Sequence, residues 1–495
     1  MATKEENETK KIAPDNEKPV KTKKKAPKRF TRFTYWFSLL CALCVGTIIG
    51  VLLILSRLQD TIATNSELSQ VIGVYKNIRG NYYKSVSKKK LINGAVDGML
   101  SSLDDPFSQY LQSDESTSLN DSISGSFEGI GAEVQQGKNA IEIVSPIKNS
   151  PAEKAGLKAK DLIVAINGKS TAKMTVDQAV SKIRGKSGSS VTLKIQRGSQ
   201  TFTVKVERGK VDQATVTGQL LATDHTIGKI QITTFAENTV SGMKTTIKSL
   251  RKQGATKFII DVRGNPGGLM DTALSLSSMF LKNKQVIMRV QARQGSEEVY
   301  RAGKKYDKGF KIDEPVTISV DGGSASAAEI FSAALQEAGR AQLVGTKTYG
   351  KGTVQTVIPL SNNSEMKFTI AKWLTPNKTW INKKGITPDI KAGYPAIANL
   401  ALISNEKSLK TGSVGSEVKL LQQNLRALGY TVEETSIYDQ QTIAAVKQLQ
   451  IKAKLANQTG TFDEATRNAL YQEVSVYILN HDNALNAAVK EIQSK

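Results

Sequence analysis

Residues 321–355 read DGGSASAAEIFSAALQEAGRAQLVGTKTYGKGTVQ, and this stretch decides how the centre of the chain folds. The five residues before it, 316–320 (VTISV), form a short β-branched apolar run that is typical of a buried strand. From Ala327 onward the apolar residues recur at helical spacing, until Gly339 provides a C-terminal stop. The sequence therefore predicts a strand, a glycine-rich turn that contains serines, and a helix.

The predicted turn would deliver a serine to the start of a helix, where backbone N–H groups are free and the helix dipole is positive. Such a position suits a nucleophile and the oxyanion that forms when it attacks. A second glycine-rich turn, Gly350-Lys351-Gly352, follows one short strand later and presents a lysine. Serine and lysine together can carry out acyl transfer if the lysine is neutral when it accepts the hydroxyl proton.

Histidine is scarce, because the chain has only His225 and His481 and neither lies in a catalytic or metal-binding motif. We therefore expect no metal site and no cofactor, and Lys351 is the natural general base. A free lysine titrates near pH 10.4, so a base that works near neutrality needs a pKa lowered by roughly three, or about 4 kcal/mol. Burial and a nearby helix N-terminus both act in that direction.

The composition is basic, with a formal net charge of +23 over 495 residues, a length that predicts several domains. A basic surface can indicate nucleic-acid binding. No module has a clustered stripe of basic and aromatic residues, however, so we expect no nucleic-acid partner. Polyanions such as anionic lipid or an acidic wall polymer are the expected neighbours. Residues 1–32 are rich in Lys, Glu and Pro with few apolar residues, which indicates disorder.

An apolar segment follows, since residues 33–56 contain no charged residue and Tyr35–Leu55 is nearly continuous apolar sequence. It is long enough to span a bilayer of roughly 30 Å, and the basic residues before it place the N-terminus in the cytoplasm. The prediction is a single-pass anchor in the cell membrane, with the catalytic domain outside. A cleaved signal peptide is the alternative, which the length of the segment disfavours. Both Cys41 and Cys44 lie inside this segment, so no disulfide is expected outside.

Beyond this segment the pattern changes several times, which predicts a multidomain α/β (α+β) protein. Helical spacing dominates at first, short strands and turns follow, and strands then alternate with helices. The expected parts are a disordered basic cytoplasmic tail at 1–32, a transmembrane anchor at 33–56, a helical segment at 60–120, a β-rich module at 121–209, an α/β core at 210–395, a small helical domain at 408–475 and a C-terminal helical tail at 476–495.

The β-rich module closely resembles a PDZ domain in the whole order of its strands, its Asn167-Gly168 turn and its helix at 176–183. The resemblance implies a groove that takes up an extended peptide tail as an additional strand. It also implies that the loop Gly129-Ile130-Gly131-Ala132 binds the carboxylate at the end of that tail. The alternative is that the two glycines only allow a tight turn.

The small helical domain contains an internal repeat, Tyr438-Asp439-Gln440-Gln441-Thr442 and Phe462-Asp463-Glu464-Ala465-Thr466. Each copy is an aromatic-Asp-x-x-Thr step before an apolar helical stretch. The domain resembles the peptidoglycan-binding domain of many cell-wall enzymes, which implies peptidoglycan as a partner. A local reading, compatible with the first, is that each Asp caps the N-terminus of a helix.

Three motifs together resemble the carboxy-terminal processing, or tail-specific, serine proteases: Arg-Gly-Asn-Pro-Gly-Gly (263–268), Ser-Ala-Ser-Ala-Ala-Glu (324–329) and Thr-Tyr-Gly-Lys-Gly-Thr-Val-Gln (348–355). They occur in the family's order, and the resemblance extends over residues 68–395. In that family the serine precedes the lysine by 25 positions, which selects Ser326 over Ser324 as the nucleophile.

By this resemblance Lys351 is the base, Gln355 orients it, and the backbone N–H groups of Ala327 and of Gly268 form the oxyanion hole, with Gly267 as the other choice from the glycine pair. Arg184 resembles an arginine through which the PDZ domain of related proteases acts on the active site, although a surface role is equally open. Glu329 matches an acidic position in the family, but packing of the helix face would also explain it.

The resemblance implies a membrane-anchored serine endopeptidase outside the cytoplasm that captures the exposed C-terminal tails of proteins and cleaves them through an acyl-enzyme. Relatives use the helices near 68–111 to dimerise, so a homodimer is expected. The alternative is a wall-anchored PDZ scaffold without proteolytic activity. The intact Ser326, Lys351 and both glycine turns argue against that alternative.

Overall fold

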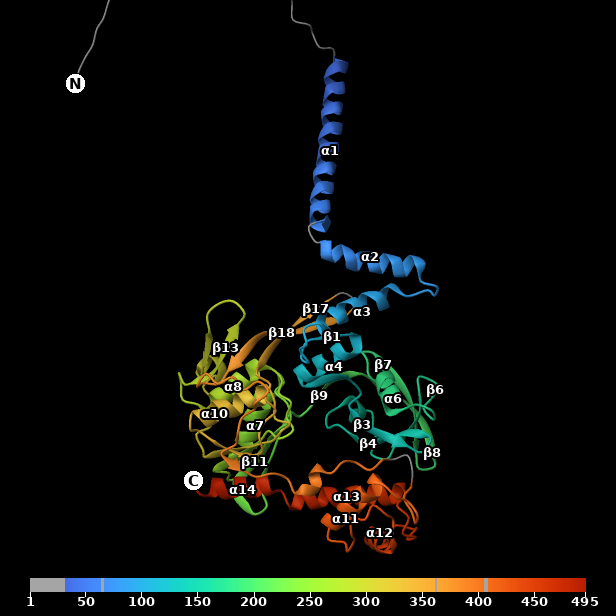
Figure 1. Cartoon of the computed structure of the whole chain (residues 1–495), viewed down its shortest axis with the longest axis vertical. Coiled ribbons are helices and arrows are strands. Elements are labelled where there is room, and N and C mark those ends of the chain that lie inside the picture. The colour runs from blue at the N-terminus through green and yellow to red at the C-terminus, as the bar shows by residue number, and fades with distance from the viewer. Residues whose placement is uncertain (1–31, 64–65, 361–362, 405–407) are drawn as a thin grey trace, which may run out of the picture. The chain divides into compact units, whose positions relative to one another are not determined.

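The computed structural model describes residues 32–63, 66–360, 363–404 and 408–495, and Figure 1 labels many of their helices and strands. The chain divides into two units, residues 1–95 and residues 96–495. The basic segment 1–32, predicted to be a disordered tail, lies outside the described residues except for Arg32, which begins the first helix. The mixture of helices and sheets agrees with the predicted multidomain α/β (α+β) class.

Three helices lie at the N-terminal end of the described chain: α1 (Arg32–Ala63), α2 (Ser66–Asn81) and α3 (Lys88–Ser101). The window Tyr35–Leu52 within α1 has a mean hydropathy of 2.1 and is long and apolar enough to cross a membrane. Among the described residues it is the one such helix. The predicted N-terminal apolar helix is therefore confirmed, and by length and composition it suits either an anchor or a signal sequence.

The β-rich module is an antiparallel sheet whose strands follow the order β3-β4-β5-β7-β8, with β6 paired to β5, so β3 is an edge strand. A two-stranded ribbon, β2 with β9, leads the chain into and out of it. The preceding helix α4 contains the predicted boundary at 121, which therefore falls inside an element. The bounds are α4 (Ser113–Ser124), β2 (Ser126–Gly129), β3 (Ala132–Gly137), β4 (Ala140–Pro146), α5 (Pro151–Lys154), β5 (Leu162–Ile166), β6 (Lys169–Ser170), α6 (Val176–Ile183), β7 (Ser190–Arg197), β8 (Gln200–Glu207) and β9 (Gly209–Asp212).

The α/β core is built on a six-stranded sheet in the order β10-β11-β12-β15-β16-β19, in which every pairing after β10–β11 is parallel. Because parallel strands end at the same edge of a sheet, the turns that follow the neighbours β12, β15 and β16 lie together. These turns carry the three sequence motifs. The bounds are β10 (Val216–Leu221), β11 (Asp224–Ile232), α7 (Thr239–Lys252), β12 (Lys257–Asp261), α8 (Met270–Phe280), β15 (Val316–Val320), α10 (Ala327–Glu337), β16 (Gln342–Gly345) and β19 (Ile390–Lys391).

A second sheet of the core follows the order β1-β18-β13-β14, with β17 also paired to β18. Strand β1 comes from the chain before the PDZ module, inside the segment predicted to be helical at 60–120. Its register sets Gln109 opposite Lys367 on β18. The bounds are β1 (Gln109–Leu111), β13 (Val286–Ala292), β14 (Glu298–Arg301), α9 (Lys304–Asp307), β17 (Thr353–Pro359) and β18 (Glu365–Leu374).

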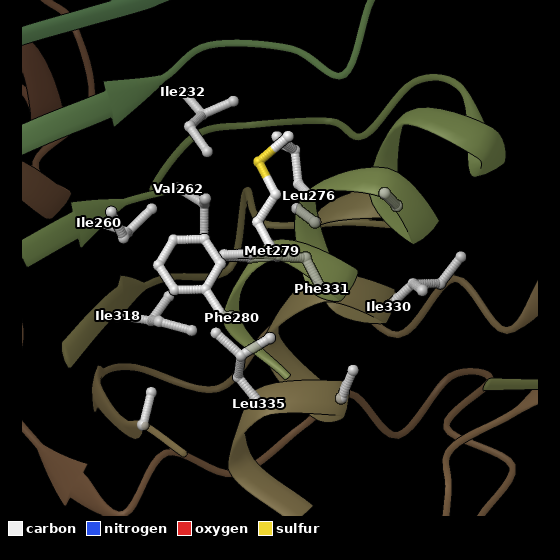
Figure 2. Close-up of a cluster of buried hydrophobic side chains, with 14 of the residues drawn as sticks. Ile232, Ile260, Val262, Leu276, Met279, Phe280, Ile318, Ile330, Phe331 and Leu335 are labelled. Carbon is white, nitrogen blue, oxygen red and sulfur yellow. The ribbon is translucent and has the colours of Figure 1, made fainter. Parts of the chain in front are cut away.

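Helices α8 and α10 pack their apolar faces on the six-stranded sheet, as Figure 2 shows for the side chains of the main cluster. Phe331 of α10 meets Phe280 of α8 in a T-shaped contact with ring centroids 5.6 Å apart. Both rings are buried against strand residues such as Ile260 and Ile318. The helix that begins at the proposed nucleophile is therefore fixed by a packed core along its whole length.

The C-terminal part contains η2 (Ala396–Asn399), α11 (Ser416–Ala427), α12 (Gln440–Lys452), α13 (Glu464–Asn480) and α14 (Asn483–Gln493). Asp439 and Asp463 each cap a helix by accepting the N–H of the Thr three residues later, so the local reading of the repeat is confirmed. The predicted boundary at 475/476 falls inside α13.

The end of the chain, predicted as a helical tail without functional signal, belongs to the core. Helix α14 packs Ala488 and Ile492, both fully buried, against Ile259 and Val344 of the six-stranded sheet. The C-terminal helix therefore covers sheet residues that are buried opposite the face packed by α8 and α10.

Candidate active site

Ser326 lies at the turn between β15 and α10, as the sequence predicts, and directly precedes the helix. Its backbone has φ 53° and ψ −113°, a left-handed region that a serine rarely adopts and that is found at functional sites. The other serine of the motif, Ser324, is fully buried and donates to the carbonyl of Val262 at 2.8 Å. Ser324 therefore has a structural role, and the half-buried Ser326 is the serine available for chemistry.

The carboxylate of Glu329 joins the serine turn to the lysine turn, and no part of its side chain is exposed. One oxygen, Oε2, accepts the backbone N–H of Ser326 at 2.9 Å and that of Lys351 at 2.8 Å. The other oxygen, Oε1, accepts the N–H of Gly350 at 2.7 Å and the hydroxyl of Thr348 at 2.6 Å. A single buried anion thus holds the main chains of both predicted catalytic residues.

The turn around Lys351 is tightly held because another loop lies against it. A Cβ at Gly350 would meet the N atom of Gly385 at 2.7 Å, and one at Gly352 would meet the N atom of Asn382 at 2.8 Å. Larger residues would push this loop away. Trp373 adds a hydrogen bond from its indole N–H to the carbonyl of Lys351 at 2.9 Å.

The amine of Lys351 lies over the ring of Phe107, with 4.6 Å between Nζ and the ring centroid. Burial lowers the pKa of Lys351 to about 8, helped by the nearby charge of Lys367, while the carboxylates of Asp105 and Glu329 act in the opposite direction. Within the part of the chain that the structure describes, no hydrogen bond joins this amine to the Ser326 hydroxyl. The direction of the pKa shift is the one that a general base requires.

Gln355, predicted to orient Lys351, donates instead to the hydroxyls of Thr353 at 2.9 Å and Thr369 at 3.1 Å. The Thr369 hydroxyl in turn donates to Asp105 at 2.6 Å. Gln355 is therefore tied to the segment before the PDZ module, and its contact with Lys351 stays a prediction. The hydroxyl of Thr348, in the same motif, donates to Glu329.

The predicted oxyanion-hole donors lie next to Ser326. The N–H of Ala327 is at the first position of α10, where helices leave donors without an intrahelical partner. The 263–268 turn is close by, since a Cβ at Gly267 would meet Ser326 Cβ at 2.8 Å. The N–H of Gly267 is taken up by Asn265 Oδ1 at 2.8 Å. Gly268 is exposed, and its role as the second donor stays a prediction.

The PDZ module has a pocket of about 490 Å³ between β3 and α6. Ile130, Gly131 and Ala132 of the predicted carboxylate loop line it, together with Arg184 at the end of α6. Gly131 has φ +74°, and a Cβ there would meet Ser150 Cβ at 2.4 Å, so the position requires glycine. Gly129 is placed one residue before the loop, in β2, opposite Gly209.

Arg184 links the pocket to α4. Its guanidinium donates to Asp121 on α4 at 2.6 Å and lies over the ring of Phe127, 4.8 Å from the centroid. Burial raises the pKa of Asp121, and Arg184 opposes that rise. Asp121 is thus a charged partner of the arginine from outside the pocket.

Sequence reasoning left Glu329 undecided and missed the segment Asp105–Ser108, which lies inside the region 60–120 that was predicted to be helical. The spacing of Ser326 and Glu329 is that of a capping box, S-x-x-E, and that signal was available. For Asp105 there was no such signal, because its partners Thr369 and Lys351 are far away in sequence.

Comparison with protein families finds four matches along the chain. Residues 226–392 match peptidase family S41 and residues 142–197 match a PDZ domain. Residues 54–115 match the N-terminal domain of the activating protease CtpB, and residues 414–470 match a putative peptidoglycan-binding domain. These matches confirm the families that the sequence motifs indicate.

Two relatives that match over most of the chain agree with these family matches. The carboxy-terminal processing protease CtpA of Bacillus subtilis strain 168 is 42% identical over 432 residues, 87% of this chain and 91% of that protein. A probable CtpA-like serine protease of Staphylococcus saprophyticus is 35% identical over 482 residues, 96% of this chain and 97% of that protein. Among solved structures, the photosystem II D1 C-terminal processing protease is 27% identical and covers 66% of this chain and 93% of its own, at a TM-score of 0.39. The chain therefore belongs to the carboxy-terminal processing serine proteases of peptidase family S41, and it carries a PDZ domain and a peptidoglycan-binding domain.

Proposed function

We propose that this protease works with a Ser326–Lys351 dyad and an acyl-enzyme, and that Gln355 orients the lysine during catalysis. The observation that carries the proposal is the carboxylate of Glu329, which accepts the N–H groups of both residues on one oxygen. The lowered pKa of Lys351 supports it, since a buried amine with a pKa of about 8 is partly neutral near pH 7.

In the proposed cycle, neutral Lys351 takes the proton of the Ser326 hydroxyl as the oxygen attacks the scissile carbonyl. The N–H groups of Ala327 and Gly268 stabilise the oxyanion. The lysine ammonium then gives its proton to the leaving amine, which departs, and the ester on Ser326 remains. Lys351 next takes a proton from water, hydroxide attacks the ester, and the serine recovers its proton.

The amine of Lys351 has to leave its position over Phe107 before it contacts Ser326. Hydrogen bonds between catalytic groups are often long or absent without substrate and form in the complex. The Thr369 and Thr353 hydroxyls that hold Gln355 would release it in the same step. We therefore propose that a movement of the Lys351 side chain away from Phe107 is the first step of the cycle.

The PDZ groove delivers the substrate in this proposal. Because β3 is an edge strand, an extended C-terminal tail can pair with its free backbone groups. The end of the tail would place its carboxylate at the loop Ile130–Ala132, beside Arg184. That carboxylate would compete with Asp121 for Arg184, so tail binding would weaken the contact between Arg184 and α4.

The remaining parts of the chain bear on where the enzyme is located and what it contacts there. We propose that the Tyr35–Leu52 helix is a retained anchor in the cell membrane, that the N-terminus is cytoplasmic, and that the protease faces the wall. The C-terminal domain would bind peptidoglycan. Apolar residues exposed on α2, including Leu68, Val71 and Ile72, suit contact with a second copy of the chain.

A tail-bearing peptide and a fluorophosphonate probe test the dyad. We expect Ser326→Ala to abolish both cleavage and labelling, and Lys351→Ala to reduce both by at least about 1,000-fold. Ser324→Ala is the matched control and is expected to keep Ser326 reactive. If the Ser326→Ala protein cleaved the peptide as fast as wild type, the dyad would be wrong. Binding of the peptide without cleavage by the wild-type chain would favour the scaffold.

A further inference from the structure

Arg263, the first residue of the 263–268 turn, has a nearly buried side chain with a full set of charged partners. Its guanidinium donates to both oxygens of Asp261, at 2.9 and 2.7 Å. It also donates to both oxygens of Asp482, at 2.7 and 2.8 Å. Only 6% of the Arg263 side chain is exposed, so these four charge-assisted hydrogen bonds fix its orientation.

Asp482 comes from the far end of the chain, just after the peptidoglycan-binding domain. It is the N-cap of α14 and also accepts the N–H of Leu485 at 2.9 Å. The ring of Tyr394 lies against the same guanidinium, with 4.8 Å between its centroid and the Arg263 Cζ. Tyr394 precedes the linker to the peptidoglycan-binding domain. The chain therefore leaves the protease core and returns to it at one arginine.

The backbone that follows Arg263 is connected to the serine turn. The N–H of Gly264 donates to Asp321 Oδ1 at 2.8 Å, and the carbonyl of Asn265 accepts the N–H of Ala325 at 2.9 Å. These bonds set the position of the glycine pair relative to Ser326. A displacement of Arg263 would move the backbone that carries Gly268.

We propose that Asp482 and Tyr394 are positioning residues for catalysis, which hold the Gly267–Gly268 turn in register with Ser326 through Arg263. The inference rests on the proposed oxyanion role of Gly268 and extends it to both connections of the peptidoglycan-binding domain. In this proposal the protease site is complete only when Tyr394, before the peptidoglycan-binding domain, and Asp482, after it, both contact Arg263.

The ion pair is not needed to keep α14 on the sheet. Ala488 and Ile492 are fully buried there, and Gln493 donates to Asp224 at 3.0 Å near the other end of the helix. Removing one partner of a buried ion pair is destabilising when it leaves a charge without a partner, but in an Asp482 variant Arg263 keeps its bonds to both oxygens of Asp261. A variant at Asp482 is therefore expected to fold with α14 in place.

The test compares full-length variants in detergent with a tail-bearing peptide and with a peptide boronate, whose tetrahedral adduct puts an oxygen in the oxyanion hole. Asp482→Ala is expected to lower kcat about 10- to 100-fold, with KM within about twofold. The affinity for the boronate should fall by the same factor as kcat/KM. Asp482→Asn keeps the helix cap and one acceptor, so its kcat should lie between those of wild type and Asp482→Ala. Tyr394→Leu should lower kcat a few-fold.

Gln493→Ala is the matched control, because it removes a contact of the same helix far from Arg263; it should keep wild-type kcat and boronate affinity. The inference is overturned if Asp482→Ala and Asp482→Asn keep wild-type kcat. It is also overturned if their losses are matched by Gln493→Ala, since that would indicate a general effect of the helix. An active Ser326→Ala protein would instead refute the dyad, so the two failures are distinct.

Discussion

The charges beside Lys351 offer a test of how the active base is produced. Burial lowers the pKa of this lysine from 10.5 to about 8, Lys367 adds to the lowering, and Asp105 opposes it. At pH 7 a lysine with a pKa of about 8 is neutral in about one molecule in ten, against about one in three thousand for an ordinary lysine. The environment therefore increases the amount of active base about 300-fold.

The perturbation is a pair of single substitutions with opposite effects. Asp105→Asn removes an anion that favours the ammonium form, so the pKa of Lys351 falls further. Lys367→Gln removes a cation that disfavours the ammonium form, so the pKa rises. A partly screened charge of this kind contributes about 1 kcal/mol. That is about 0.7 in pKa and, at pH 7, close to a fourfold rise in the neutral fraction for Asp105→Asn and close to a fivefold fall for Lys367→Gln.

The assay is kcat/KM for a tail-bearing peptide from about pH 6 to about pH 11, because this ratio reports ionisations of the free enzyme. Each profile is scaled to its own plateau, since Asp105→Asn also changes the hydrogen bonds to Ser108 and Thr369 and will alter the absolute rate. The midpoint should lie near pH 8 for wild type, lower for Asp105→Asn and higher for Lys367→Gln.

A shift of both midpoints in the same direction would refute the reasoning, because two charges of opposite sign cannot act alike through electrostatics. Unchanged midpoints in both variants would show that the ionisation belongs to another group. Lys372→Gln, another lysine of β18 whose amine lies over Trp380, is the control and should leave the midpoint in place.

Three further substitutions test the framework. Glu329→Gln turns an amide donor toward donors such as the Gly350 N–H. We expect the free energy of unfolding to fall by about 2–3 kcal/mol and kcat to fall about 100-fold. Gly267→Ala puts a methyl group 2.7 Å from the Ala325 carbonyl oxygen and 2.8 Å from the Ser326 Cβ at φ +103°, so probe labelling should fall at least about tenfold and Tm should fall as well. Ile492→Ala leaves a cavity under α14 and should cost about 2–4 kcal/mol in urea unfolding; unchanged stability would mean that α14 does not dock.

Much of the core is predictable from local patterns. The strand at Val316–Val320, the helix starting at Ala327 and the helix at Met270–Phe280 follow from apolar runs, helical spacing and glycine stops. The three motifs each follow a strand, so their turns are also predictable. Their meeting at one edge depends on the strand order, which local patterns do not give; the resemblance to a family implied only that the three motifs share one site.

The parts that the sequence did not reveal depend on contacts between distant segments. The apolar spacing of Leu485, Ala488 and Ile492 predicts a buried helix face, but nothing in it names the sheet as the partner. Asp105 reads as part of a helix stop, although in the folded chain it faces Lys351 and Thr369. Gln355 was assigned by resemblance, and its hydrogen bonds to Thr353 and Thr369 depend on the pairing of β17 with β18, which the local pattern does not give.

The docking of α14 also has a consequence for biosynthesis. The core sheet is translated well before residues 483–493, and during that interval Ile259 and Val344 lack the helix that covers them. The peptidoglycan-binding domain has to be made, and the chain has to come back, before Arg263 acquires its second carboxylate. A nascent chain that still lacks α14 would therefore contain every proposed catalytic group while Ile259 and Val344 are uncovered and Arg263 lacks its bonds to Asp482.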